Sequence, residues 1–256
     1  MNNAPVRTVS DAKRDFYTHH TRPINSIYRR VVDELMVEMH LLSVNVDFAY
    51  DPIYALGIVT TFDRFMVGYQ PENDKTSIFS ALCQSINSTA EHYRGDAEAI
   101  KASANGMSLD DLKGQFENLS DGGEGLRGTL ASIANKEKFK YSRPFGVGLY
   151  TLVEAAAPAE GLKEKDTVEA LFKELGSKLN IVTDKLLKDV DLYRSNLEKF
   201  AQAQEVMKDM LAADRKKREE RQKAAEAAAE AIAESVDTAP KAAESGEAAE
   251  SEEATQ

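Results

Sequence analysis

Apolar residues spaced three or four positions apart, from Phe172 to Leu211, constrain the fold more than any other feature of the chain. This spacing places them along one side of an α-helix, as in a coiled-coil seam. We expect one long helix from Asp166, roughly 60 Å or more at about 1.5 Å per residue, of which part projects from the body. Two consecutive four-residue steps ending at Val190 predict a stutter. The seam, in which only Gln204 is polar, consists of Phe172, Leu175, Leu179, Val182, Leu186, Val190, Tyr193, Leu197, Phe200, Gln204, Met207 and Leu211.

The most hydrophobic and least charged segment of the chain runs from Leu35 to Glu72. Between Ile53 and Phe65, apolar residues occupy every side of a helical wheel, which is typical of a helix surrounded by protein. Asp51 can cap this helix, and Pro52 suits its first position because the missing N–H needs no partner there. We therefore predict a buried central helix.

Helical patterns account for most of the remaining chain. Ser108 and Asp111 have the spacing of a capping box, which predicts a short helix after them. The run from Asp121 to Gly128 predicts a loop by its glycine content, followed by a short helical stretch to Ala134. The apolar segment 147–157 receives no assignment. The other expected helices are residues 10–20 with Ser10 as N-cap, 24–46, 74–93, and 96–105 after an interruption at Gly95.

No strand alternation occurs in the sequence, so we predict an all-α protein built as a single helical bundle. A long coiled-coil-like helix and an acidic tail complete the chain. The tail composition cannot form a core and predicts a segment without fixed structure, preceded by a fraying, solvated helix beyond the seam. The expected boundaries are 6–165 for the helical body, 166–223 for the long helix and 224–256 for the tail.

The net charge of −11 is unevenly distributed. The segment from Ala224 to Gln256 carries nine acidic residues and one lysine, which leaves about −3 for the preceding 223 residues. A nearly balanced body argues against nucleic acid as a partner. The longest almost uncharged run, Pro52 to Phe62, is shorter than the roughly 20 residues that a membrane-spanning helix needs. The first residues resemble neither a secretory signal nor an obvious transit peptide.

The sequence offers little for catalysis or for a cofactor. Gly123, Gly125 and Gly128 spell G-x-G-x-x-G, but no strand precedes them and Glu124 would repel a phosphate. No Glu-x-x-His motif of a di-iron site occurs, and no G-x-S-x-G nucleophile elbow. The single Cys83 lies among apolar residues and is expected in the core. We therefore predict no enzyme, no metal and no cofactor.

A basic turn interleaved with aromatic residues is the main candidate for a partner surface. A solvated loop is the simpler interpretation of such a charge run, and a peripheral membrane contact is the functional alternative. The solvent side of the long helix is the second candidate surface. The residues expected to bind a partner are Lys136, Lys138, Lys140, Tyr141, Arg143, Lys185, Lys188 and Arg194.

Four segments together resemble the thylakoid formation protein family, also described as a photosystem II biogenesis auxiliary protein. The resemblance extends over about Val6 to Leu211. It rests on VEMHLLSVN (residues 37–45), FAYDPIYALGIVTTFDRFMVGYQPE (48–72), IFSALC (78–83) and KFKYSRPFGVGLYTLVE (138–154).

The resemblance implies a non-enzymatic accessory factor that binds and stabilises FtsH-type membrane metalloprotease complexes in photosystem II biogenesis and repair. Photosystem II assembly or repair intermediates are a further partner class, and the thylakoid membrane surface a peripheral one. Plant members carry a transit peptide; its absence here leads us to expect a cyanobacterial protein in the cytoplasm, peripheral to the thylakoid. Two alternatives stay open. One is a helical-bundle protein that binds or processes a lipid or pigment near Tyr50, Asp63 or Tyr69; the other is a scaffold that oligomerises through the seam.

Overall fold

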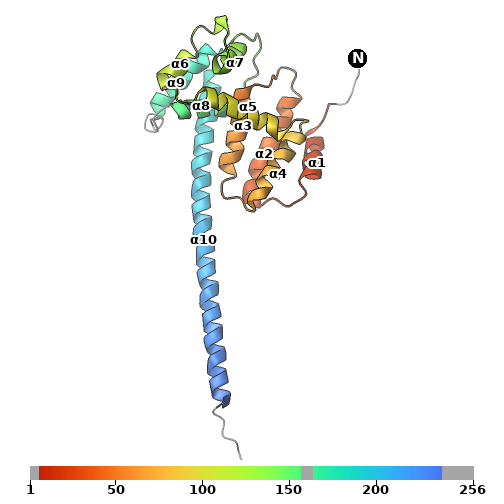
Figure 1. Cartoon of the computed structure of the whole chain (residues 1–256), viewed down its shortest axis with the longest axis vertical. Coiled ribbons are helices and arrows are strands. Elements are labelled where there is room, and N and C mark those ends of the chain that lie inside the picture. The colour runs from red at the N-terminus through yellow and green to blue at the C-terminus, as the bar shows by residue number, and fades with distance from the viewer. Residues whose placement is uncertain (1–5, 157–163, 238–256) are drawn as a thin grey trace, which may run out of the picture. The chain divides into compact units, whose positions relative to one another are not determined.

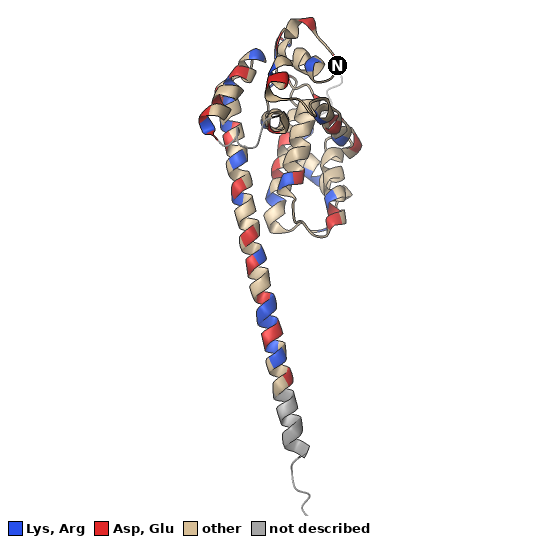
Figure 2. Ribbon diagram, turned by 60° about the vertical axis from the view of Figure 1, so that its left-hand side comes forward, with Lys and Arg blue, Asp and Glu red and all other residues tan. Residues whose placement is uncertain are grey.

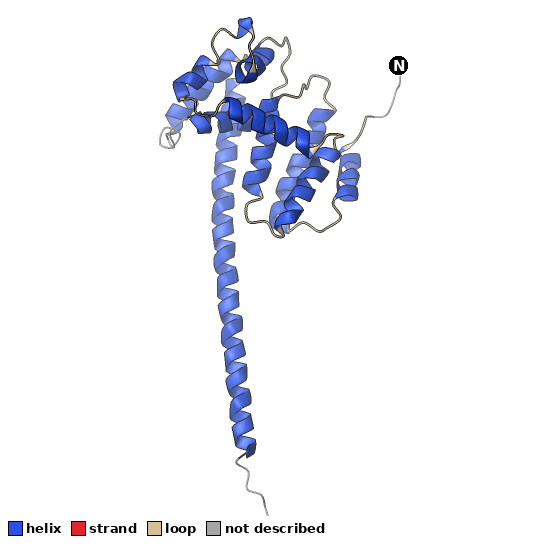
Figure 3. Ribbon diagram, viewed as in Figure 1, coloured by secondary structure: helices blue, strands red, loops and turns tan. Residues whose placement is uncertain are grey.

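The computed structural model describes residues 6–156 and 164–237, with side chains to residue 227, and every regular element in these ranges is a helix (Figure 3). The predicted all-α class is therefore confirmed. The chain divides into two compact units, one ending at Gln202 and one beginning at Ala203. The elements, of which Figure 1 labels all but η1, are α1 (Val9–His19), α2 (Ser26–Ser43), α3 (Pro52–Phe65), α4 (Glu72–Gln84), α5 (Ala90–Ser103), α6 (Leu109–Gly114), η1 (Leu119–Asp121), α7 (Gly125–Ala134), α8 (Arg143–Ala156), α9 (Lys165–Lys178) and α10 (Thr183–Asp237).

Helix α3 lies at the centre of the first unit, as its apolar circumference predicts. It contributes side chains to both hydrophobic clusters of the core: one formed largely by α1, α2 and α4, the other by α5 to α10. The predicted cap is confirmed, because the Asp51 carboxylate accepts a hydrogen bond from the Tyr54 N–H at 2.9 Å and Pro52 opens the helix. Sequence therefore fixes where this helix begins, and burial on all sides fixes its place.

Two glycines bring α3 and α8 into backbone contact. A Cβ on Gly57 would lie 1.7 Å from the Pro144 carbonyl oxygen, and a Cβ on Gly148 would lie 1.9 Å from the Ile53 carbonyl oxygen. No other residue type fits at such distances. The apolar segment that the sequence left unassigned is thus α8, and its glycines serve close packing rather than a turn.

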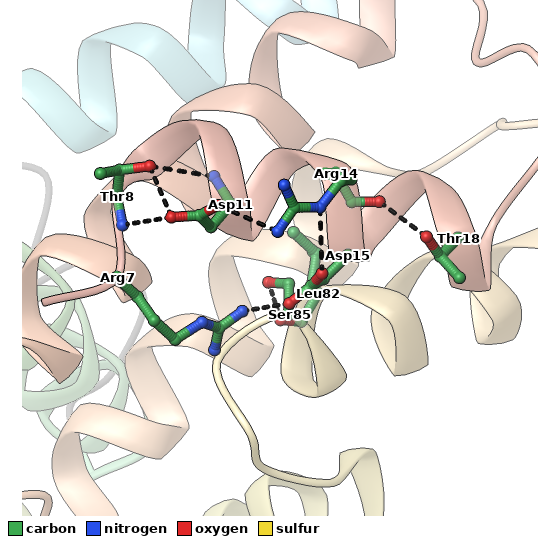
Figure 4. A network of polar contacts seen from close by, with 8 residues as sticks. All are labelled: Arg7, Thr8, Asp11, Arg14, Asp15, Thr18, Leu82 and Ser85. Atoms are coloured by element: carbon green, nitrogen blue, oxygen red, sulfur yellow. Dashed lines mark hydrogen bonds and ion pairs between the residues drawn. The ribbon is translucent and has the colours of Figure 1, made fainter. Parts of the chain in front are cut away.

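The N-cap of helix α1 lies two residues before the one that the sequence suggested (Figure 4). The cap is Thr8 and not Ser10, because Thr8 and Asp11 form a reciprocal capping box: the Asp11 N–H donates to Thr8 Oγ1 at 3.2 Å, and the Thr8 N–H donates to Asp11 Oδ2 at 3.0 Å. Asp15 on α1 pairs with Arg7, which precedes the helix. The capping-box prediction for Ser108 and Asp111 is confirmed at the start of α6.

The boundary between α4 and α5 differs from the prediction. We expected a helix to continue to Tyr93 and Gly95 to interrupt it, yet the break lies at residues 85–89 and Gly95 is inside α5. Asn87 adopts a left-handed conformation with φ 59°, and Thr89 caps α5 by accepting from the His92 N–H. Asparagine tolerates positive φ and threonine favours helix caps, so these two residues outweigh a glycine in an open helical position.

The expected single helix along the seam is two helices. Asn180 has φ 55°, and the Ile181 N–H donates to the Gly176 carbonyl at 3.1 Å, which closes the end of α9 before α10 begins. Val182 falls in this break and is 69% exposed, so it leaves the seam. The sequence pattern did not reveal this break, because the apolar residues on either side of it keep the spacing of three and four positions although α9 and α10 are separate helices.

Burial along the seam declines towards its end. Phe172, Leu186 and Val190 are at most 1% exposed, whereas Leu211 is 64% exposed. Helix α9 and the first part of α10 therefore belong to the core of the first unit. Helix α10 extends to Asp237, so residues 224–237 of the expected tail are helical; the rest of the tail lies outside the described residues. The glycine run also differs from the predicted loop, because Gly125 to Gly128 form the first turn of α7.

Candidate functional site

The basic turn between α7 and α8 ties three helices together. Arg143 donates to one oxygen of Glu38 on α2 from two nitrogens, at 2.7 and 3.2 Å. The Tyr141 hydroxyl donates to Asp189 on α10 at 3.0 Å, and the Lys185 ammonium lies 5.2 Å from the centre of the Tyr141 ring. The structure therefore brings together three of the eight residues predicted to bind a partner. Their contacts are internal to the fold.

Burial decides the electrostatics of this network. It raises the pKa of Glu38, and the guanidinium of Arg143 offsets only part of that rise. Burial also lowers the pKa of Arg143, but the hydrogen bonds and charge of Glu38 outweigh it and leave this pKa raised. The pKa of Tyr141 is raised, first by burial and then by the charge of Asp189. The raised pKa values keep Arg143 charged and Tyr141 neutral at neutral pH.

Lys136 has an internal role of a different kind. Asp51, the cap of α3, is 6% exposed, and burial raises its pKa to about 6. The charge of Lys136 acts against this rise. The half-buried Lys136 therefore compensates a buried carboxylate and presents less of its charge to a partner than the sequence suggests.

The remaining predicted residues lie at the surface. Lys138, Lys140 and Lys188 are exposed, and none of them forms an ion pair with another described residue. Arg194 is half-buried on α10, where its charge acts on Tyr150 of α8. Figure 2 shows basic and acidic residues interspersed along α10. Of the eight predicted residues, these three lysines are thus exposed cations that make no ion pair or aromatic contact with another residue of the described ranges.

Sequence reasoning missed the contribution of α2. A surface cleft of about 990 Å³ runs between α2, the basic turn and the start of α10, and it contains the network of Glu38 and Arg143. On its rim, Val37 and Leu41 are 37% and 54% exposed. Both residues fall off the apolar stripe of α2, and an apolar residue on the polar face of an amphipathic helix is the signal that would have found them.

A second hollow continues from this cleft. It has a volume of about 320 Å³, lies between α2 and α10 with α3 and α8 behind it, and shares Arg30, Glu34, Glu38 and Arg143 with the cleft. Its other lining residues are Ile27, Val31, Leu35, Thr61, Phe65, Pro144, Val147, Leu192, Tyr193, Asn196, Lys199 and Phe200.

The three residues proposed for a lipid or pigment site do not converge. The Tyr50 hydroxyl donates to Asp96 at 2.8 Å, and its ring stacks on His92. Tyr69 is 2% exposed and packs edge-on against Tyr28. Asp63 pairs with Arg94 at 3.0 Å, on the rim of a separate cleft of about 390 Å³. Each residue is engaged at a different place in the fold.

Within the described ranges, no three His, Cys, Asp or Glu side chains are grouped as metal ligands. Cys83 is fully buried, and burial raises the pKa of its thiol to about 12. In the same part of the chain, no helix combines the length and the apolar composition needed to cross a membrane.

Comparisons with known proteins extend over most of the chain. The profile of the family described as thylakoid formation protein matches residues 8–222. The protein Thf1 of Nostoc punctiforme is 57% identical over 223 residues, which cover 86% of this chain and 94% of that protein. The protein Thf1 of Trichormus variabilis is 58% identical over 223 residues, which cover 86% and 95%. The solved structure of Psb29 superimposes with a TM-score of 0.73 at 40% identity, covering 83% of this chain and 98% of that one.

Proposed function

The chain belongs to the thylakoid formation protein family, and we propose that it is a non-enzymatic accessory factor that binds and stabilises an FtsH-type membrane metalloprotease complex during photosystem II biogenesis and repair. The observation that carries this proposal is the family membership, established by the match over residues 8–222. We further propose a cytoplasmic location at the periphery of the thylakoid membrane, with photosystem II assembly or repair intermediates as additional partners.

The residues proposed to contact the protease are Lys138, Lys140 and Lys188. The bonds of Tyr141 to Asp189 and of Arg143 to Glu38 hold the backbone of the turn in place, so less backbone freedom is lost there on binding. The exposed side chains of Val37 and Leu41 lie on the neighbouring cleft. A basic rim beside exposed apolar side chains suits an acidic protein surface with an apolar centre.

A pull-down from solubilised thylakoids, followed by mass spectrometry, tests the proposal. The experiment also needs a shortened chain that lacks the second unit. Removing everything after Asp166 would delete the core residues Phe172, Leu186 and Val190, which are at most 1% exposed. A chain that ends at Gln202 keeps the first unit intact. We expect both the full chain and this shorter chain to recover FtsH subunits.

The double variant Lys138→Glu/Lys140→Glu tests the surface. We expect it to recover at least tenfold less FtsH, because like charges then face the partner. The matched control is Lys216→Glu/Lys217→Glu, two adjacent lysines on the exposed part of α10, with an expected recovery equal to that of the unaltered chain. If the full chain recovers no FtsH from intact complexes, the proposed function is wrong. Equal losses in both double variants contradict only the placement of the surface.

A further inference from the structure

The hollow between α2 and α10 combines an apolar wall with a charged mouth. The wall is aromatic on the α3 and α10 sides: the rings of Phe65 and Tyr193 lie 6.0 Å apart, and those of Phe65 and Phe200 lie 5.4 Å apart. Val31 from α2 and Val147 from α8 complete it. A volume of about 320 Å³ lies within the range of small-molecule sites, which are mostly apolar with a few placed polar groups.

The orientation of the two helices decides which groups stand at each end of the hollow. Tyr28 near the start of α2 contacts Phe200 on α10 with ring centres 5.8 Å apart, whereas Glu38 further along α2 binds Arg143. Tyr141, two residues before Arg143, binds Asp189 of α10. Helices α2 and α10 therefore run antiparallel. The Glu38–Arg143 pair lies towards one end of the hollow, where it meets the cleft, and Lys199 lies towards the other.

The charges at the mouth do not cancel. Arg30 pairs with Glu34 at 2.9 Å and Arg143 pairs with Glu38 at 2.7 Å, so both carboxylates that line the hollow are neutralised. Lys199 also lines it and forms no ion pair with any residue in the described ranges. Asn196 lies three positions earlier on the same face of α10 and adds an amide donor. The mouth thus carries one uncompensated positive charge beside an apolar wall.

We propose that this hollow binds a single-chain amphiphile with an anionic head group, such as a fatty carboxylate. The acyl chain lies along Val31, Phe65 and Val147, and the head group binds Lys199 and Asn196. This site goes beyond the proposed protease contact and uses other residues. Every lining residue belongs to the first unit, which ends at Gln202.

A head-group series tests the charge selectivity. Calorimetric titration of the full chain, below the micelle concentration of each probe, compares dodecanoate, dodecanol and dodecyltrimethylammonium. We expect dodecanoate to bind one molecule per chain and the cationic probe to bind at least tenfold more weakly. Decanoate, which is two methylenes shorter, is expected to bind roughly tenfold more weakly than dodecanoate. Equal affinity for the three head groups would overturn the proposal.

Variants at the mouth test the location. Leu192 is 46% exposed, so Leu192→Trp fills the hollow from its rim without overpacking the core. Dodecanoate should then bind at least tenfold more weakly. The matched control is Val67→Trp, at a residue that is 54% exposed and does not line the hollow. Because the described chain is helical, an unchanged far-UV circular dichroism spectrum shows whether each variant is folded.

A charge reversal completes the test. Lys199→Glu should weaken dodecanoate at least tenfold and strengthen dodecyltrimethylammonium, whereas Lys208→Glu, further along α10 and outside the lining, should change both by less than twofold. Dodecanoate should also raise the midpoint of thermal unfolding of the unaltered chain. Unchanged dodecanoate affinity in both Leu192→Trp and Lys199→Glu would show that the amphiphile binds elsewhere and would refute the assignment.

Discussion

Helix α3 meets α8 at backbone distance, whereas α2 faces α10 across a hollow of about 320 Å³. Both contacts lie within the first unit. The first depends on Gly57 and Gly148, which have no side chain to keep the helices apart. The second is lined by long side chains such as Arg30 and Lys199, which extend into solvent and leave space behind them. The comparison shows that side-chain size at a helix crossing decides whether it becomes a rigid core contact or a place for a ligand.

The largest expected effect is at the tight contact. The substitution Gly57→Ala places a Cβ 1.7 Å from a backbone oxygen that cannot move independently of α8. We expect the free energy of unfolding to fall by roughly 3 kcal/mol or more, as measured by urea denaturation. A loss below about 1 kcal/mol would mean that α8 can shift away, and the contrast with α10 would then disappear.

A second effect concerns the start of α3. The pKa of Asp51 in the folded chain is about 6, above the ordinary value of 3.8, so the native state favours the protonated carboxyl. The stability that this group contributes is present below pH 3.8 and is lost as the pH rises through about 6. Asp51→Asn keeps a side-chain acceptor for the cap and removes the charge. We expect it to stabilise the protein at pH 7 by roughly 2 kcal/mol.

Urea denaturation between pH 4 and pH 7 checks this effect. The advantage of Asp51→Asn should be small at pH 4 and grow up to pH 7, because only the unaltered carboxyl ionises across that interval. Lys136→Met should destabilise the unaltered chain more than the Asp51→Asn variant. If the difference in free energy of unfolding between Asp51→Asn and the unaltered chain does not vary with pH, ionisation of the buried Asp51 is not what destabilises the protein.

A smaller effect is expected at the ion pair that joins Arg143, at the start of α8, to Glu38 on α2. Arg143→Met leaves the largely buried Glu38 without its partner, which should lower the free energy of unfolding at pH 7 by about 1–2 kcal/mol. The pKa of Glu38 is already raised by burial and rises further without the guanidinium. The deficit should therefore be full above this raised pKa and shrink as the pH falls through it. A double-mutant cycle with Glu38→Gln isolates the pair, and zero coupling would contradict the network.

The smallest expected effect is a stabilisation that serves as the control for Gly57. Gly95 lies inside α5, and a Cβ there meets no atom within 4 Å. Gly95→Ala should raise the free energy of unfolding by about 0.5–1 kcal/mol, through lower entropy of the unfolded chain and higher helix propensity. The same chemical change should thus have opposite signs at the two glycines. If Gly95→Ala destabilises the protein instead, the added methyl group meets a neighbouring atom and the position is not open.

Local chemistry made much of the fold predictable. The cap of α3 at Asp51 and the capping box at Ser108 act within one helical turn, so adjacent residues suffice to place them. The break between α9 and α10 was not predictable in this way, because the apolar spacing passes through Asn180 unchanged. The break between α4 and α5 was misplaced for a similar reason: Gly95 looked like a stop, but Asn87 and Thr89 provide the turn and the cap.

The candidate surface was predictable only as a set of residue types. The sequence pattern grouped the basic residues of the turn and of α10. It could not distinguish exposed lysines such as Lys138 from residues such as Arg143, whose charge is paired within the fold. That division depends on Glu38 and Asp189, which are 105 and 48 residues away from their partners in the chain. The cleft and the hollow beside α2 had no sequence signal beyond two apolar residues on a polar face.

The sequence by itself determined the all-α class, the burial of α3, the caps of α3 and α6, and the family. Each of these follows from the order of neighbouring residues or from similarity along the chain. The tertiary structure decided where α9 ends, which charges are neutralised and that Lys199 stands beside an apolar wall. Those outcomes depend on which side chains from distant segments meet, and on how closely two helices approach when a glycine or a lysine lies between them.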